Sequence, residues 1–471
     1  MRKRNDGPGK RAAGVRGDGG DDTAAEREPA RWQGGADDDG MPQARDISIA
    51  DEPGEWGRGP WAPFPVPTVH PDPEDRPAHP PAHPTGPGAV LALVRGGIAT
   101  TRAELMAATG LSRSTMASRL EALVEAGHIE AAGTGGATGG RRANSFRLRP
   151  DSGVLLVADI GGSHIHTALT DMAGEILVSD RRPFDVAKGP LKVLNEVAAG
   201  FDQLCVESGD VHHKVRGIGV GVPGPVEAAT GRVVSPPIMT GWDGYRVPDF
   251  FRERFDCPVL VDKDTNLMAL GEHRANWPAE EHLLFVKAGT GIGSGLVLGG
   301  RLHRGAQGAA GDIGHVPAPG VDETSDDAPR CRCGQSGCLE ALAGGWALVR
   351  ELKAAGHRVR TTDDVVRLVR DGDGDAVRLL RQAGRLLGQA LADTVSLLNP
   401  SLLVIGGGLA YAQEHLLAGV REMTYRRSLP LATRELRVAL SPLRTAAGVV
   451  GAAHEVADAL FDPAAVDAEL R

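Results

Sequence analysis

Cysteine and histidine residues in one stretch of the chain have the spacing of a metal site. Three of the five cysteines lie between Cys331 and Cys338, and His315 lies upstream of them. Three thiolates and an imidazole form the ligand set of a closed, tetrahedral zinc site. Gly334 and Gly337 favour the tight turn that such closely spaced ligands need. The sequence therefore predicts a structural zinc ion held by His315, Cys331, Cys333 and Cys338; three thiols without a metal are the alternative.

Three glycine-rich turns each follow an apolar stretch that is typical of a buried strand. The apolar stretches cover residues 154–158, 283–286 and 402–405. Glycines let a backbone approach a phosphate, and a carboxylate such as Asp159 can hold magnesium through water. Their wide separation favours a nucleotide held between two related lobes over a single Rossmann unit. The predicted nucleotide contacts are Asp159, Gly161, Gly162, Ser163, Gly289, Thr290, Gly291, Gly293, Gly406, Gly407 and Gly408.

Residues 88–150 have the pattern of a winged helix-turn-helix. Thr101 and Glu104 form a capping box at the start of a second helix, and Ser112 caps a third helix over residues 113–127. Two helices joined by a short turn that contains glycine are the elements of this DNA-binding motif. The third helix is predicted to bury Met116, Leu120, Leu123 and Val124. The residues predicted to contact phosphates and base edges are Arg113, Ser114, Thr115, Ser118 and Arg119.

Two short segments after the third helix are predicted to be strands that flank a glycine-rich wing. The wing ends in Arg141 and Arg142, which are predicted to contact phosphates or the minor groove. From Arg95 to Arg149 the sequence has eight arginines against four glutamates, a local excess of positive charge. A small helical domain that binds another protein is the alternative.

Length, charge and composition limit the class of protein. A chain of 471 residues allows two or three domains, and a net charge of −9 is unlike that of a nucleic-acid coat protein. We expect no membrane span, since no apolar run approaches the roughly 18 residues required. We also expect no secretory signal and a cytoplasmic location. Residues 1–87 hold 15 of the 32 prolines and 16 acidic against 11 basic residues, which predicts a disordered tail.

Several longer phrases resemble the ROK family (repressors, open reading frames and kinases). They are residues 112–115, 139–142, 219–226, 236–242 and 304–315, together with the cysteine cluster. The resemblance covers roughly residues 88 to 460. It implies an α/β protein, with a winged helix-turn-helix followed by a two-lobed actin-like ATPase (ribonuclease H-like) sugar-kinase fold. The expected domains are a tail (1–87), a DNA-binding domain (88–150), a small lobe (151–264, completed by a helix over 446–460) and a large lobe (265–445) with the zinc loop 311–340.

The resemblance also implies a sugar site. Asp264 occupies the position of the base that takes a proton from the sugar hydroxyl, and Lys263 occupies the usual position of a sugar-binding asparagine. Asp312 stands where the family usually has glutamate. The implied sugar contacts are Lys263, Asp264, Asp312, His315 and Glu340.

Lys263 changes the chemistry expected of this site. A lysine beside Asp264 would pair with it and lower its pKa, which weakens it as a base. We therefore expect a sensor whose kinase activity is weak or lost. The positive charge of Lys263 makes an acidic or phosphorylated sugar one hypothesis for the ligand, beside a neutral sugar or an empty cleft.

The leading hypothesis is a transcriptional repressor of carbohydrate metabolism. It would bind double-stranded operator DNA and release it when a sugar or sugar derivative closes the two lobes. Two-fold dimers or higher homo-oligomers on palindromic half-sites follow from the motif. Structural zinc is expected, and ATP with magnesium only if kinase activity is retained. The alternatives are an active ATP-dependent, glucokinase-like sugar kinase with a DNA-binding head and a regulator controlled by protein contact.

Overall fold

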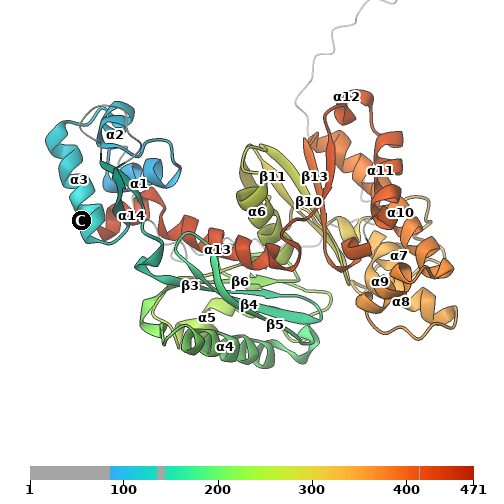
Figure 1. Ribbon diagram of the computed structural model, residues 1–471. Coiled ribbons are helices and arrows are strands. Elements are labelled where there is room, and N and C mark those ends of the chain that lie inside the picture. Colours follow the sequence, from blue (N-terminus) through green and yellow to red (C-terminus); the bar gives the residue numbers. More distant parts are fainter. Residues whose placement is uncertain (1–84, 135–143, 413) are drawn as a thin grey trace, which may run out of the picture. The chain divides into compact units, whose positions relative to one another are not determined.

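The computed structural model describes residues 85–134, 144–412 and 414–471 (Figure 1). The predicted disordered tail lies almost wholly outside the described residues, and so does the tip of the wing with Arg141 and Arg142. Among the described helices, none combines the length and the apolar character that a membrane crossing requires.

Three helices and a two-stranded antiparallel sheet make up residues 87–148. They are α1 (Pro87–Arg95), α2 (Arg102–Thr109), α3 (Arg113–Glu125), β1 (Ile129–Thr134) and β2 (Asn144–Leu148). The Thr101 side chain accepts from the amide of Glu104, and the Glu104 carboxylate accepts from the amide of Thr101, so α2 begins with a complete capping box. Leu105, Met116 and Leu120 are buried between the helices. The prediction that Val124 faces inward is wrong, because α3 turns it outward with 43% exposure.

The small lobe is a five-stranded sheet in the order β5-β4-β3-β6-β9. Its strands are β3 (Val154–Ile160), β4 (His164–Asp171), β5 (Ile176–Pro183), β6 (Val215–Val222) and β9 (Val259–Lys263). Leu156 and Ala158 face the core formed with α4 (Pro190–Glu207) and α5 (Val247–Arg252). Leu155 and Val157 face the core formed with α13 (Ala447–Leu460) on the opposite side (Figure 1). Both faces of β3 are therefore covered, which explains its unbroken apolar sequence.

The large lobe repeats this topology. Its sheet has the order β12-β11-β10-β13-β14. The strands are β10 (His282–Ala288), β11 (Ile292–Leu298), β12 (Arg301–His303), β13 (Leu402–Gly406) and β14 (Arg437–Leu440). In each sheet the central strand, β3 or β10, pairs antiparallel with the next strand and parallel with a later one. The predicted fold of two related α/β lobes is confirmed.

Helices cover the large-lobe sheet. The long α10 (Gly374–Leu398) ends at Asn399, whose left-handed backbone (φ 45°) stops the helix before Pro400. The others are α6 (Asp264–Asn276), α7 (Leu339–Ala343), α8 (Gly345–Ala354), α9 (Thr362–Arg370), α11 (Glu414–Arg427) and α12 (Pro430–Thr433).

Helices α6 and α13 pack together through glycine. A Cβ atom at Gly451 of α13 would lie 1.8 Å from the carbonyl oxygen of Leu267, and one at Gly271 of α6 would lie 2.3 Å from that of Ala447. These backbones are therefore in direct contact. A final helix, α14 (Pro463–Glu469), follows α13 and was not predicted from the sequence. Its Asp467 carboxylate accepts a hydrogen bond from the amide of Gly88 at 2.8 Å.

We expect Gly451→Ala to destabilise the protein. Alanine has a helix propensity better than glycine by about 1 kcal/mol. However, the new Cβ atom would lie 1.8 Å from the Leu267 carbonyl oxygen, and this clash forces the two helices apart. Overpacking of this kind costs roughly 1–3 kcal/mol, so the clash should dominate and lower the midpoint of thermal unfolding measured by circular dichroism. Gly374→Ala is the control, because a Cβ there meets no atom within 4 Å; an equal loss in both variants would contradict the packing argument.

Candidate functional site

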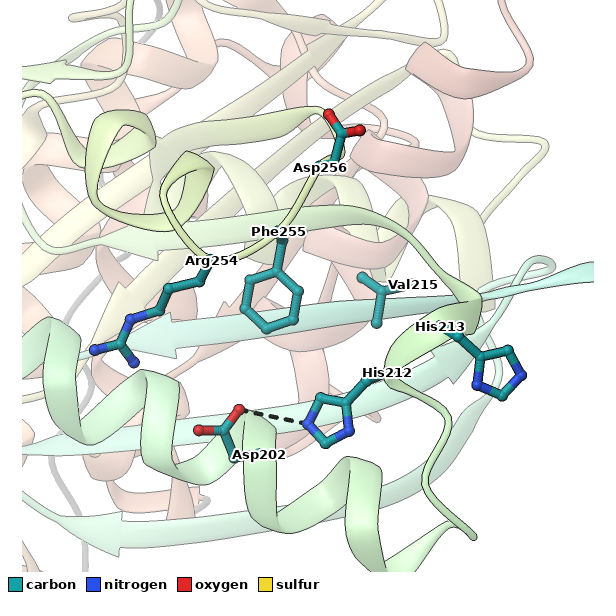
Figure 2. A pocket seen from close by; sticks show the side chains of 7 residues that line it. All are labelled: Asp202, His212, His213, Val215, Arg254, Phe255 and Asp256. Atoms are coloured by element: carbon teal, nitrogen blue, oxygen red, sulfur yellow. Dashed lines mark ion pairs between the residues drawn. The ribbon is translucent and has the colours of Figure 1, made fainter.

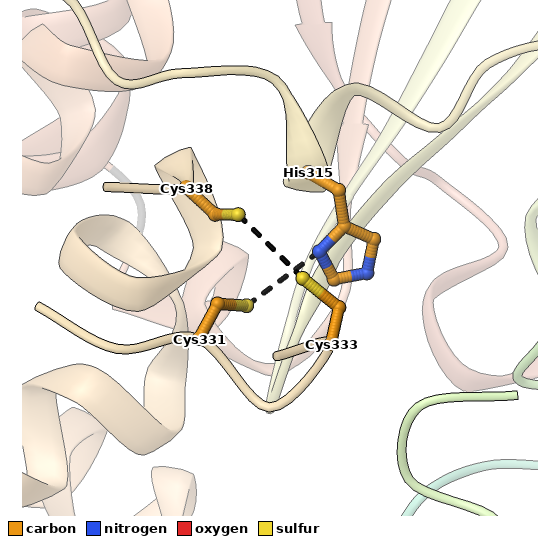
Figure 3. Close-up of side chains that lie close together, drawn as sticks. All are labelled: His315, Cys331, Cys333 and Cys338. Atoms are coloured by element: carbon orange, nitrogen blue, oxygen red, sulfur yellow. Dashed lines mark hydrogen bonds between the residues drawn. The ribbon is translucent and has the colours of Figure 1, made fainter. Parts of the chain in front are cut away.

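The four residues predicted to hold zinc lie together. The nitrogen and sulfur ligand atoms of His315, Cys331, Cys333 and Cys338 all lie within 4.8 Å of one another (Figure 3). The Cys331 sulfur is 3.6 Å from Nδ1 of His315, and the Cys333 sulfur is 3.7 Å from that of Cys338. Burial raises the pKa of the Cys331 and Cys338 thiols. A zinc ion would supply the positive charge that stabilises the thiolates, and this donor set fits it.

The cysteine cluster lies close in sequence to Glu340, one of the predicted sugar contacts. Glu340 is buried at the start of α7, two residues after Cys338. One carboxylate oxygen accepts the amide of Ile292 at 2.9 Å, and the other accepts the indole N–H of Trp346 at 3.1 Å. The guanidinium group of Arg332, from the cysteine loop, lies 4.8 Å from the centre of the Trp346 ring. The loop therefore carries three of the four candidate metal ligands and also contacts Trp346, the residue that binds Glu340.

Asp264, the predicted base, forms an ion pair with Lys287. The carboxylate accepts the Lys287 ammonium on one oxygen and the Thr265 amide, at 2.7 Å, on the other. Both partners are largely buried, with side-chain exposures of 5% for Asp264 and 15% for Lys287. Burial alone would lower the pKa of Lys287, but the nearby carboxylates of Asp264 and Asp159 raise it above its ordinary value. Lys287 therefore stays charged at neutral pH.

Lys263 does not make the ion pair that the sequence predicts. Its ammonium donates to the carbonyl oxygen of Ala310 at 2.8 Å, while Lys287, from the other lobe, takes the place beside Asp264. Burial lowers the pKa of Lys263, and the carboxylates of Asp312, Asp264 and Asp262 oppose that shift. Asp312 is exposed. The two residues at which the chain departs from the family pattern, Lys263 and Asp312, thus interact electrostatically in the structure.

A second buried charge network was missed by the sequence reading. Asp262 accepts the Asn266 amide at 2.8 Å and Arg304 Nε at 2.7 Å, and Arg304 also contacts Glu455 of α13 at 2.5 Å. Arg304 belongs to a phrase that resembles the family, and Asp262 directly precedes the implied sugar contacts Lys263 and Asp264; these are the signals that could have singled them out. Their pairing, however, joins residues from β9, the segment after β12, and α13.

Protein side chains fill the space beside two of the predicted phosphate-binding glycines. A Cβ at Gly161 would lie 2.2 Å from the imidazole of His164, and one at Gly291 would lie 2.3 Å from a Glu340 oxygen. The second and third turns meet, since a Cβ at Gly407 would lie 2.5 Å from the Ala288 carbonyl. At these positions the lack of a side chain permits close packing of the protein on itself.

A surface cavity of about 560 Å³ lies elsewhere on the small lobe (Figure 2). His212 in this cavity is 3.5 Å from Asp202 and 2.7 Å from Asp210, and the hydrogen bond to Asp210 raises the pKa of its imidazole most strongly. Its lining consists of Asp202, His212, His213, Val215, Arg254, Phe255 and Asp256. The predicted sugar and nucleotide residues lie outside it, so the buried charge clusters identify the candidate site better than this hollow does.

The third helix of the N-terminal unit presents most of the predicted DNA contacts. Arg113, Ser114 and Ser118 are exposed on α3, and Thr115 and Arg119 are half-buried. The Ser112 hydroxyl lies 2.9 Å from that of Thr115 and accepts the Thr115 amide at 3.2 Å. The Thr115 hydroxyl is therefore part of the helix cap, and the exposed residues are better placed to reach a ligand.

Comparison with known proteins identifies relatives of two kinds. The sequence profile of the ROK family matches residues 156–459. The xylose repressor of Caldicellulosiruptor bescii is 26% identical over 378 residues, which cover 77% of this chain and 93% of the repressor. A ROK family transcriptional regulator, a homologue of the E. coli MLC protein, has a TM-score of 0.67 at 25% identity and covers 82% of this chain and 98% of its own. A ROK family glucokinase from Streptomyces griseus, solved with glucose and AMPPNP, has a TM-score of 0.56 at 28% identity. The match covers 64% of this chain and 99% of the glucokinase.

We expect the purified protein to carry one equivalent of zinc that depends on the cysteine cluster. Cys333→Ser removes one thiolate, so it should lose the zinc measured by atomic emission and lower the temperature of unfolding. Cys257→Ser is the matched control, because Cys257 lies outside the cluster. Full zinc content in Cys333→Ser, or the same loss in Cys257→Ser, would contradict the assignment.

Proposed function

The chain belongs to the ROK family, and we propose that it is a DNA-binding transcriptional repressor whose kinase-like lobes bind a sugar. The observation that carries this proposal is the extent of the similarity. Residues from β3 to Arg471 make up about 68% of the chain, so the 82% matched by the regulator must also include residues that precede β3. The glucokinase covers 64%. The similarity to a regulator thus extends beyond the lobes that kinases share.

Residues 87–148 are the proposed DNA-binding unit, with α3 as the helix that enters the major groove. The exposed Arg113 and Ser118 lie five residues, about 1.4 turns, apart on α3. An arginine can donate two bonds to a guanine edge, and a serine hydroxyl can bind either a base or a phosphate. The wing arginines Arg141 and Arg142 would add phosphate contacts. Binding as a homodimer to paired half-sites follows from this geometry.

The electrostatics of the cleft favour a neutral sugar over an acidic or phosphorylated one. Lys287 is paired with Asp264, and Arg304 is paired with Asp262 and Glu455. Lys263 faces three aspartates and donates to a carbonyl group. An anionic sugar would have to displace one of these interactions. The exposed carboxylate of Asp312 suits a sugar hydroxyl, and the name of the Caldicellulosiruptor relative points to a neutral pentose.

Two helices connect the proposed sugar site to the proposed DNA-binding unit. Helix α6 begins at Asp264 and carries Arg274 in its last turn. Asp458 of α13 accepts Arg274 at 2.7 Å and Arg95 of α1 at 2.6 Å. At the other end of α13, a Cβ at Gly448 would lie 2.5 Å from the Asp159 carboxylate group. A sugar that moves one lobe would therefore shift the support of α1, which is the physical basis for release of DNA.

Fluorescence anisotropy with duplex DNA from the region upstream of the protein's own gene tests the function. We expect specific binding that a neutral sugar from a panel of pentoses and hexoses weakens. Arg113→Ser should weaken binding by on the order of tenfold or more. The control Arg358→Ser alters an exposed arginine of the large lobe and should leave binding unchanged. Equal effects of the two substitutions, or binding that every sugar leaves unaltered, would contradict the proposal.

Asp458→Asn tests the connection between the sites. Removing the negative charge breaks the bridge between Arg95 and Arg274. Because these groups are partly exposed, the loss of stability should be at most about 1 kcal/mol. We expect the ratio of operator affinities without and with sugar to fall towards one. Asp393→Asn, at an exposed position of α10, is the control; an unchanged ratio in Asp458→Asn would show that coupling takes another route.

A further inference from the structure

The two lobes place opposite charges at equivalent positions. Asp159 is the next-to-last residue of β3, and Lys287 is the next-to-last residue of β10, the matching strand of the other lobe. Each lies opposite a glycine of its parallel neighbour, Gly221 for Asp159 and Gly406 for Lys287. Because the two sheets share one topology, Asp159 and Lys287 occupy equivalent positions in the two lobes.

Lys287 supplies positive charge where buried carboxylates gather. Asp159 and Asp264 have relative exposures of 1% and 4%. The Lys287 ammonium binds Asp264 directly, and both Asp159 and Glu340 act electrostatically on it. Oδ1 of Asp159 is buried and has no hydrogen-bond partner among the described residues. Buried carboxylates are costly without a partner of opposite charge. Lys287 supplies that charge to Asp264, and the His164 imidazole, 3.9 Å from the Asp159 carboxylate, also stabilises Asp159.

Phosphoryl transfer makes two demands on such a cluster. A divalent cation must spread the charge of the transferred phosphate, and a free carboxylate must accept a proton from the attacking hydroxyl. In this chain the Lys287 ammonium lies among the carboxylates that would attract the metal. It also forms an ion pair with Asp264, the carboxylate at the position of the proton acceptor. The imidazole of His164 and the carboxylate of Glu340 fill the space beside the glycines Gly161 and Gly291.

We propose that Lys287 is an internal cation that replaces the metal–nucleotide complex, so that the cleft binds its sugar without a nucleotide and does not phosphorylate it. Lys287 is then the residue that separates sensing from catalysis in this chain. A divalent cation brought to the same carboxylates would be repelled by the ammonium. The sugar-binding clause rests on the proposed function, whereas exclusion of Mg-ATP follows from the cleft alone.

The test uses the full-length protein and Mg-ATP as the probe. Isothermal titration calorimetry should detect no saturable binding of Mg-ATP by the wild-type protein, and coupled ADP-release assays with the sugar panel should show no turnover above that of Asp264→Asn. Lys287→Gln removes the charge but keeps a hydrogen-bond donor. We expect it to gain affinity for Mg-ATP by on the order of tenfold or more. Lys353→Gln, at an exposed position of α8, is the matched control.

Three results would overturn the proposal. They are saturable binding of Mg-ATP by the wild type, sugar-dependent turnover that Asp264→Asn abolishes, and a folded Lys287→Gln protein that binds Mg-ATP no better than the wild type. If Lys287→Gln fails to fold, the two wild-type measurements decide alone. Operator binding is read separately, so loss of the repressor proposal would leave this test intact.

Discussion

The need to neutralise buried carboxylates where the two lobes meet is the constraint on which the rest of the structure depends. Asp159, Asp262 and Asp264 are almost fully buried, and isolated charges in such surroundings are strongly disfavoured. The chain meets this need with Lys287 for Asp264 and with Arg304 for Asp262 and Glu455. Both cations come from the large lobe and reach carboxylates of the β9–α6 segment. The interactions that neutralise these carboxylates therefore also join the lobes.

The same segment links the cleft to the N-terminal helices. Helix α6 starts at the paired Asp264 and packs through glycine against α13, whose Asp458 binds α1 through Arg95. Tightly packed backbones transmit displacement better than mobile side chains do, because they have little room to adjust. The proposed zinc ligands and Glu340, a proposed sugar contact, belong to one segment of the chain, residues 315–340. We therefore propose that the kinase-like fold acts as a sensor in which α6 and α13 connect the sugar site to the DNA-binding unit.

Local sequence was enough for much of this account. The Cys-x-Cys spacing with an upstream histidine predicted four residues that the structure brings within 4.8 Å, since a tight glycine turn determines most of that geometry. Strand–glycine phrases predicted two related lobes, because backbone topology follows from such patterns. Pairing between distant residues could not be predicted in this way. Lys263 adjoins Asp264 in sequence, yet Lys263 ends β9 and donates to Ala310, whereas Asp264 begins α6. Lys287 reaches Asp264 from 23 positions away.

The response of operator binding to sugar in the absence of nucleotide tests the central claim most directly. Full-length protein bound to labelled operator DNA would be titrated with neutral sugars in buffer freed of ATP and magnesium, and again with both added. The account predicts that one sugar releases the DNA at the same concentration in both buffers. Release that requires Mg-ATP, or that shifts markedly when it is added, would contradict it.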